Sequence, residues 1–168
     1  MSGQSEFANM IYPHARKGAD NTPRIYPMAY TITHECVGCS VCMRVCPVDA
    51  IVGKPKARHR ILPEVCIDCG ACGRICPYAS VKDPEGQVCE RIRIRSRWPK
   101  PVFDYQRCVG CIICLESCPT GCIALKFDQG DRKTIRYPFL AKTRNCIGCA
   151  FCMLDCTVDA VGMDKQTG

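Results

Sequence analysis

The chain has 168 residues, 18 of them cysteine, with 23 basic and 16 acidic side chains and a formal net charge of +7. Cysteine at about 11 % lies above the ~8–10 % that marks a specialised chain. No apolar stretch approaches the ~18 residues that a membrane-spanning helix needs, so we expect no membrane span. Residues 1–30 lack the apolar core of a secretory signal, which predicts a cytoplasmic protein whose cysteines bind metal rather than form disulfides.

The N-terminal segment 1–28 is polar, carries three prolines and shows no helix or strand periodicity. Two interpretations stay open: a flexible tail, or an arm that becomes ordered on a partner subunit. In either case we expect folded structure to begin at residue 29, where the hydrophobic pattern starts.

Short strand and helix signals follow in the first half of the chain. We expect a strand at 30–32 and a short helix that begins at 43–45 and ends at Cys46-Pro47, because proline removes a backbone donor. The apolar pair at 51–52 and the segment 60–62 look like the two arms of a hairpin.

The second half repeats this plan. A strand is expected at 102–105. A hairpin is expected to join 123–127 to 134–137 across the turn at 128–131, whose sequence Asp-Gln-Gly-Asp is typical of turns. A strand and a hairpin are thus expected in both halves, in line with the internal duplication that the repeated cysteine spacing below indicates.

A basic segment separates the two halves. Residues 91–95 alternate arginine and isoleucine, which predicts a strand with one basic face. That face is either a solvated sheet edge or a docking strip for an acidic partner. We expect the solvated edge, since charged edges commonly protect a sheet from aggregation.

Sixteen of the cysteines fall into four copies of one spacing, C-x2-C-x2-C-x3-C. The first three copies are followed by proline, whereas Thr157 takes that place in the fourth. The copies are Cys36, Cys39, Cys42 and Cys46; Cys66, Cys69, Cys72 and Cys76; Cys108, Cys111, Cys114 and Cys118; and Cys146, Cys149, Cys152 and Cys156.

Three thiols within seven residues are typical of an iron–sulfur cluster. A structural zinc site usually draws its ligands from two well-separated pairs. The compact trio instead suits a [4Fe–4S] cube, and in this bacterial-type run the fourth cysteine ligates the other cluster. Disulfides are disfavoured because closely spaced thiols have no unique pairing. A zinc-binding structural module is kept as the alternative of another class.

The four runs, together with the phrases CPVDAI at 46–51 and CPTGCI at 118–123, resemble the bacterial-type two-[4Fe–4S] ferredoxin, present twice in tandem. The resemblance implies an α+β fold: two tandem ferredoxin-like domains, each with short hairpins and helices around two clusters. It also implies the division of the chain, which is an N-terminal extension at 1–28, domain 1 at 29–83, a linker at 84–100 and domain 2 at 101–168.

The same resemblance implies four [4Fe–4S] clusters with crossed ligands, and we name the four cysteine groups accordingly. The expected ligands are Cys36, Cys39, Cys42 and Cys76 in the first set; Cys66, Cys69, Cys72 and Cys46 in the second set; Cys108, Cys111, Cys114 and Cys156 in the third set; and Cys146, Cys149, Cys152 and Cys118 in the fourth set. Thr157 removes no ligand from this scheme.

The net charge changes once clusters are counted. A cube with four thiolates carries roughly −2 when oxidised, so four cubes add about −8 and take the chain from +7 to about −1. The basic residues then compensate cluster charge. We therefore expect no nucleic-acid partner, and no aromatic stacking platform accompanies the basic residues.

The expected function is electron transfer without catalysis. A cube bound by four cysteines has no open position for substrate, and no flavin, nicotinamide or nucleotide motif is present. Four clusters suit a relay that carries single electrons between a low-potential donor or acceptor, such as soluble ferredoxin, and the catalytic subunit of a larger anaerobic oxidoreductase. A free-standing diffusible polyferredoxin is the alternative.

The relay is similar to the polyferredoxin subunits that partner tungsten aldehyde oxidoreductase-type catalytic subunits, including class II benzoyl-CoA reductase. This resemblance implies a larger catalytic partner of the tungsten- or molybdenum-pterin kind. Molybdopterin relatives usually have less regular spacing in some runs, whereas this chain is regular throughout.

The remaining reactive side chains are expected to be structural. Cys89 and Cys122 are read as small buried hydrophobes, and the three histidines as surface residues. The apolar residue after each first cysteine is expected to cover a cluster face: Val37, Ile67, Val109 and Ile147. Without its clusters such a small core should leave the chain unfolded or molten.

Overall fold

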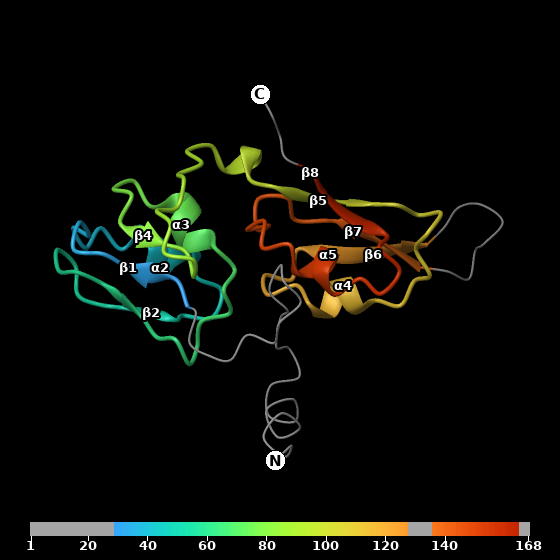
Figure 1. The fold of residues 1–168 in the computed structure, drawn as a ribbon. Coiled ribbons are helices and arrows are strands. Elements are labelled where there is room, and N and C mark those ends of the chain that lie inside the picture. Colours follow the sequence, from blue (N-terminus) through green and yellow to red (C-terminus); the bar gives the residue numbers. More distant parts are fainter. Residues whose placement is uncertain (1–28, 128–135, 165–168) are drawn as a thin grey trace, which may run out of the picture.

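The computed structural model describes residues 29–127 and 136–164. The expectations for segment 1–28 and for the turn at 128–131 lie outside these residues. Two small units lie side by side, each built of short strands and short helices (Figure 1). Every sheet in the described residues has two strands, so no large sheet provides a scaffold.

In the first unit the leading strand pairs with the last. Strand β1 (Thr31–Ile32) is antiparallel to β4 (Val81–Lys82), and β2 (Ile51–Val52) forms a hairpin with β3 (Arg60–Ile61). The predicted strand and hairpin are therefore confirmed within a residue or two. The unit also contains helices α2 (Val41–Val45) and α3 (Ala71–Ile75). As predicted, α2 ends next to Cys46, which caps it, but it begins at Val41, two residues before the predicted start.

The second unit repeats this topology with longer strands. Strand β5 (Lys100–Phe103) pairs with β8 (Val161–Asp164), and β6 (Ile123–Phe127) pairs with β7 (Arg136–Leu140). Its helices are α4 (Ile113–Glu116) and α5 (Phe151–Leu154). β5 begins and ends two residues before the predicted strand. The duplication seen in the sequence is thus a duplication of backbone topology.

Each helix begins from the same backbone conformation. The residue after the second cysteine of every run is left-handed, with φ between 60° and 71°, at Ser40, Gly70, Ile112 and Ala150. These four residues differ chemically, yet all precede the turn that carries the third cysteine. The shared conformation therefore follows from the cysteine spacing and not from a preference of one residue type for positive φ.

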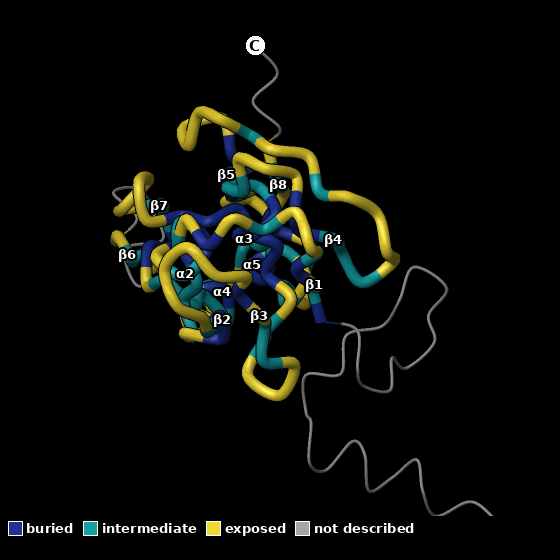
Figure 2. The backbone as a smooth tube through the Cα atoms, turned by 90° about the vertical axis from the view of Figure 1, so that its left-hand side faces the viewer, coloured by how far each residue is buried: buried dark blue, intermediate teal, exposed yellow. Residues whose placement is uncertain are grey.

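The predicted strand at 91–95 is wrong. The backbone N–H of Ile92 donates to the carbonyl of Arg74 at 3.0 Å, and the carbonyl of Ile92 accepts from Trp98 Nε1 at 3.0 Å. These groups bond to helix α3 and an indole, so they cannot form a strand ladder. The chain then enters a 3-10 helix, η1 (Arg95–Arg97). The arginines of this segment are exposed, as expected. Most of the chain that follows Lys82 and leads to Lys100 is exposed (Figure 2).

An apolar core joins the two units, and we call it the inter-unit core. It contains three residues of the first unit, two of the second, and Trp98 from the connecting segment; its buried members are Val45, Cys69, Ala71, Trp98, Ile147 and Phe151. Trp98 is 0 % exposed. The segment expected to be a linker therefore supplies a central residue of the contact between the units.

Candidate metal centres

The first set lines one cavity. This cavity is bordered by Cys36, Cys39, Cys42 and Cys76, with Ile32, His59 and Val81 among the other lining residues. Burial, followed by the neighbouring Cys36, Cys39 and Cys76 thiols, raises the pKa of Cys42 to about 11. Helix α2 supplies Cys42, and the chain returns from α3 to bring Cys76 to the same space.

The fourth set lines a second cavity. It is bordered by Cys118, Cys146, Cys149 and Cys152, together with Cys122. Here too the structure gathers three cysteines of one run with the last cysteine of another. Burial and then the Cys149 and Cys146 thiols raise the pKa of Cys152 to about 12.

The second and third sets are gathered in the same crossed manner. Burial and then the Cys69 and Cys66 thiols raise the pKa of Cys72, and after burial the Cys46 thiol raises the pKa of Cys69. In the third set, burial is followed by the thiols of Cys108, Cys111 and Cys156 in raising the pKa of Cys114 to about 11. In each case burial is the largest cause of the raised pKa, and the neighbouring thiols add to it.

Each of the two cavities is lined by the four sulfurs of one expected ligand set, the number that a [4Fe–4S] cube needs. Within residues 29–127 and 136–164, no three Cys, His, Asp or Glu side chains lie close enough to bind one metal ion. Tetrahedral zinc needs its sulfurs at about 2.3 Å from one ion. A [4Fe–4S] cube makes a different demand, because each thiolate binds its own iron. The two sulfur-lined cavities fit that demand.

Backbone N–H groups point at the last cysteine of three runs. The donors are Ala50 to Cys46 Sγ at 3.3 Å, Cys122 to Cys118 Sγ at 3.4 Å, and Ala160 to Cys156 Sγ at 3.2 Å. Each donor lies four residues after its cysteine. Such bonds stabilise a thiolate and tune the potential of a bound cluster. The sequence analysis did not anticipate donors at this spacing.

Glycine contributes a donor in one run. A backbone hydrogen bond from Gly148 lowers the pKa of Cys146, after the larger effect of the Cys122 thiol. In the second run Asp68 stands where the other runs have glycine, and it keeps a positive φ of 52°. Its carboxylate accepts from Cys66 Sγ at 3.6 Å, so the thiol form of Cys66 is favoured. The conformation needed at this position is therefore kept although the residue changes.

Both leftover cysteines lie beside expected ligands. Cys122 is buried, as predicted, and its Sγ lies 3.4 Å from Cys118 Sγ. A hydrogen bond from the Cys122 thiol lowers the pKa of Cys118. Cys89 is partly buried, and a side chain at Gly73 would meet it at 2.5 Å.

One histidine differs from the surface position expected for it. His59 is 1 % exposed, and its Nδ1 lies 3.9 Å from Cys36 Sγ while Nε2 lies 3.3 Å from Ser40 Oγ. Gly53 admits it, because a Cβ at that position would lie 2.6 Å from the imidazole ring. No spacing in the sequence distinguishes His59 from an exposed histidine. His34 is exposed, as expected.

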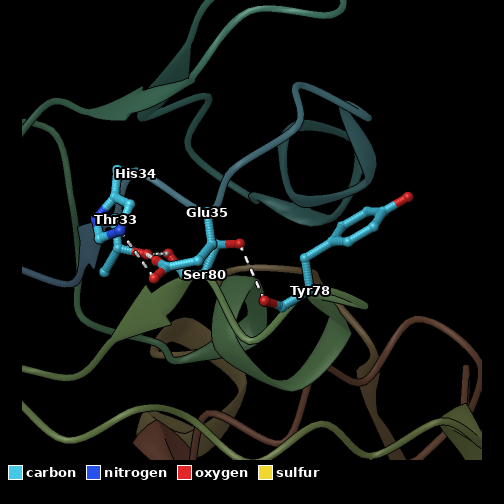
Figure 3. A network of polar contacts seen from close by, with 5 residues as sticks. All are labelled: Thr33, His34, Glu35, Tyr78 and Ser80. Atoms are coloured by element: carbon cyan, nitrogen blue, oxygen red, sulfur yellow. Dashed lines mark hydrogen bonds and ion pairs between the residues drawn. The ribbon is translucent and has the colours of Figure 1, made fainter.

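A polar network lies at the rim of the first set (Figure 3). The backbone N–H of Thr33 donates to the Ser80 carbonyl at 2.8 Å, which joins the end of β1 to the segment after Cys76. The hydroxyl of Ser80 donates to the Tyr78 carbonyl at 3.2 Å. Thr33 also donates to the Glu35 carboxylate, and this hydrogen bond lowers the pKa of Glu35.

The sets differ in exposure. Ile147 is 2 % exposed and Ile67 packs against the inter-unit core, so these two positions are covered as expected. Val37 borders the first cavity, as expected of a residue that covers a cluster face, although it is 48 % exposed; Val109 is 60 % exposed. The difference arises because only the second and fourth runs face the other unit.

Two segments of the chain match the family described as the 4Fe-4S dicluster domain, residues 35–80 and 107–160. Together they make up more than half of the chain. The chain belongs to the 4Fe-4S dicluster domain family. The expectation of a ferredoxin-like iron–sulfur protein is therefore confirmed. Both matched segments contain two complete cysteine runs, and the dicluster domain occurs once in each unit.

The curated relatives are components of a redox complex. The chain is 38 % identical over 52 residues to a subunit of the ion-translocating oxidoreductase complex of Aeromonas hydrophila subsp. hydrophila, which is 31 % of this chain and 28 % of that protein. It is 45 % identical over 40 residues to the subunit of the same name in Haemophilus influenzae, covering 24 % of this chain and 21 % of the relative. The chain thus matches less than a third of the length of these relatives.

A solved assembly shares a weaker likeness. A chain of the formate dehydrogenase–heterodisulfide reductase–formylmethanofuran dehydrogenase complex from Methanospirillum hungatei aligns with 89 % of this chain and 60 % of its own length, at 20 % identity and a TM-score of 0.40. In the described residues, no helix has the length and apolar character needed to cross a bilayer.

Proposed function

We propose that the chain binds four [4Fe–4S] clusters through the four crossed cysteine sets and serves as a non-catalytic electron-transfer subunit. It relays single electrons between a low-potential donor or acceptor and the catalytic subunit of a larger oxidoreductase. The cytoplasm is the proposed compartment, and soluble ferredoxin is the proposed small redox partner. The division into an extension at 1–28, domains at 29–83 and 101–168, and a connecting segment at 84–100 belongs to the same proposal.

One observation carries this proposal. The first cavity combines three cysteines of the first run with Cys76 of the second, and the other combines three of the fourth run with Cys118 of the third. This exchange of the last cysteine is the arrangement that the ferredoxin resemblance implies. It supports cube binding because each run then contributes to two clusters of one unit.

Four cysteine ligands leave no iron position open to substrate, so a bound [4Fe–4S] cluster supplies reversible one-electron transfer. The chain's own residues set the conditions. Backbone N–H groups of Ala50, Cys122 and Ala160 stabilise charge on sulfur. Buried apolar residues such as Ile32, Val81 and Ile123 keep water from the cysteine sets.

A larger partner is supported by the relatives, whose names place them in an ion-translocating oxidoreductase complex. A tungsten- or molybdenum-pterin catalytic subunit is the partner proposed here. The exposed Cys39 and Cys111, with exposed Val37 and Val109 beside them, provide places where a redox partner can approach.

Anaerobic isolation from the natural host tests the proposal. We expect a brown protein with about sixteen irons and sixteen acid-labile sulfides per chain, the content of four cubes. After reduction with dithionite it should show low-temperature EPR signals, and a larger redox subunit should co-purify. A colourless chain that holds zinc and no labile sulfide would contradict cluster binding. A monodisperse chain that binds four clusters alone would contradict the complex.

A further inference from the structure

Arg74 lies on α3, two residues after Cys72, and its guanidinium reaches into the second unit. Nη1 donates to the carbonyl of Cys69 at 3.0 Å and to that of Ile147 at 3.3 Å, and Nη2 donates to the carbonyl of Gly148 at 2.9 Å. Ile147 and Gly148 belong to the loop between two cysteines of the fourth run. One side chain therefore joins a cysteine loop of the first unit to a cysteine loop of the second.

The cysteines of these loops also meet in the inter-unit core. Cys69 is buried there, and the partly buried Cys149 packs against the same residues. The second and fourth sets are thus neighbours across the unit boundary, and we call them the inner sets. The first and third sets are the outer sets, and each has one exposed cysteine, Cys39 and Cys111.

The surroundings hold Arg74 in place. Its guanidinium carbon lies 6.0 Å from the centre of the Trp98 ring, and Trp98 is fully buried. Close packing of the second unit adds to this, because a Cβ at Gly148 would lie 2.9 Å from the Pro99 carbonyl. A second cation, Lys100, is buried nearby and donates from Nζ to the Cys146 carbonyl at 3.1 Å. Positive charge is therefore concentrated where the inner sets meet.

We propose that Arg74 is a positioning residue that fixes the packing of Cys149 against the core that holds Cys69, that this packing is the redox junction between the units, and that Arg74 holds a positive charge between the inner sets. This rests on the proposed electron-transfer function. Exchange at the junction would move one electron between the clusters that the two inner sets hold, so the cluster that gives the electron is oxidised and the cluster that takes it is reduced. Because reduction adds negative charge, a cation between the sets favours their reduced forms.

The junction also orders the four sets. An electron that enters at one outer set passes through the two inner sets before it reaches the other outer set. The order is therefore first, second, fourth and third, which is not the order of the runs along the chain. The two outer sets, with their exposed cysteines, are then the places of exchange with separate partners.

The test uses the full chain, loaded with clusters anaerobically, in three variants. Arg74→Met removes the charge and the hydrogen bonds, whereas Arg74→Lys keeps the charge and loses the planar fork that reaches three carbonyls. Arg44→Met is the matched control, because Arg44 follows Cys42 as Arg74 follows Cys72 but is exposed. The readouts are iron content, midpoint potentials from EPR-monitored titration, and spin–spin interaction in the fully reduced protein.

Arg74→Met should shift the one-electron equilibrium of the inner sets toward the oxidised form by roughly three- to tenfold, where tenfold equals about 59 mV. It should also weaken the spin–spin interaction between them. Arg74→Lys should keep the midpoint potentials close to those of the unchanged chain but show the weaker spin–spin interaction. Arg44→Met should change neither the potentials nor the interaction.

Two results would overturn the proposal. One is an Arg74→Met protein with full iron content whose potentials and spin–spin interaction match those of the unchanged chain. The other applies if the Arg74→Met protein takes up no clusters. In that case, an Arg74→Lys protein with full iron content and an unchanged spin–spin interaction would overturn the proposal. A chain that takes up no iron and sulfide, even with Arg74 present, overturns the proposed function instead, so the two failures are distinguishable.

Discussion

The sulfur of Cys122 lies 3.4 Å from the sulfur of Cys118, although Cys122 lies outside the four cysteine runs. Cys122 is buried, and its thiol donates toward Cys118, whose pKa is lowered as a result. The same thiol is close enough to Cys146 to lower the pKa of that residue too. Cys122 therefore acts on the fourth set as a hydrogen-bond donor.

Cys122→Ala is expected to retain the full iron content and to lower the midpoint potential of one set. Loss of the S–H donor removes stabilisation of the more negative reduced form, on the order of 1 kcal/mol. EPR-monitored titration of the loaded protein measures this shift. Cys89→Ala is the control, since Cys89 packs against the core of the first unit and not beside the fourth set, and it should leave that potential unchanged. Loss of iron in Cys122→Ala would instead make Cys122 a ligand.

The crossed ligand sets predict which serine variants behave alike. Cys46→Ser and Cys72→Ser should disturb the same EPR signal, because both belong to the second set. Cys76→Ser and Cys42→Ser should together disturb a different one. Comparison of the EPR spectra of the four reduced variants tests whether the ligand sets are crossed. If Cys46→Ser instead matched Cys42→Ser, each run would bind its own cluster and the crossing would be wrong.

Trp98 is expected to hold the units together. It is 0 % exposed, and its Nε1 donates to the Ile92 carbonyl at 3.0 Å. Trp98→Ala should cost about 3–5 kcal/mol of unfolding free energy, because it leaves a cavity in the inter-unit core. Trp98→Phe should cost less, since it keeps most of the apolar volume. Chemical denaturation of the loaded protein measures both, with the exposed Val88→Ala as a surface control.

If Trp98 contributed nothing to the stability of the inter-unit core, denaturation would give a different result. Trp98→Ala would then unfold at the same denaturant concentration as Val88→Ala. Limited proteolysis offers a second measurement, because separation of the units should expose the segment 84–100 to cleavage in Trp98→Ala and not in Trp98→Phe.

Gly38 and Gly86 form a matched pair. Both have positive φ, 69° and 83°, but a Cβ at Gly38 would lie 2.4 Å from the backbone of Ala57, whereas nothing lies within 4 Å at Gly86. Gly86→Ala should cost only the left-handed strain of about 1–2 kcal/mol. Gly38→Ala should cost several kcal/mol, because backbone must move beside the first set. Equal thermal midpoints for loss of visible absorbance in the two variants would refute this.

Removal of iron should melt the chain. The strands are two to five residues long and the helices four or five, so local structure alone is marginal. Anaerobic chelation is expected to abolish near-UV circular dichroism and the cooperative thermal transition, and reloading with iron and sulfide should restore both. A chelated, fully reduced chain that still unfolds cooperatively would show that the polypeptide core suffices.

The chemistry of this protein could be predicted from sequence because it depends on local spacing. Three cysteines within seven residues approach one another whatever the rest of the chain does, and the strand and helix between runs are similarly local. For this reason the cysteine runs, the hairpin at 51–52 with 60–61 and the ferredoxin-like family were all predicted correctly. The alternation of arginine and isoleucine at 91–95 led to the wrong prediction of a strand, because tertiary hydrogen bonds to Arg74 and Trp98 outweigh so short a pattern.

Only the tertiary structure decided how the two units meet. The carbonyls that Arg74 reaches lie 73 and 74 residues along the chain, and the burial of His59 and Trp98 depends on neighbours that no periodic pattern reports. The sequence alone does not show whether a cationic or aromatic side chain is exposed to water or buried in a packed core. Long-range packing determines where such a side chain lies, and desolvation makes each of its contacts strong. In this chain the same packing places the second cysteine set beside the fourth.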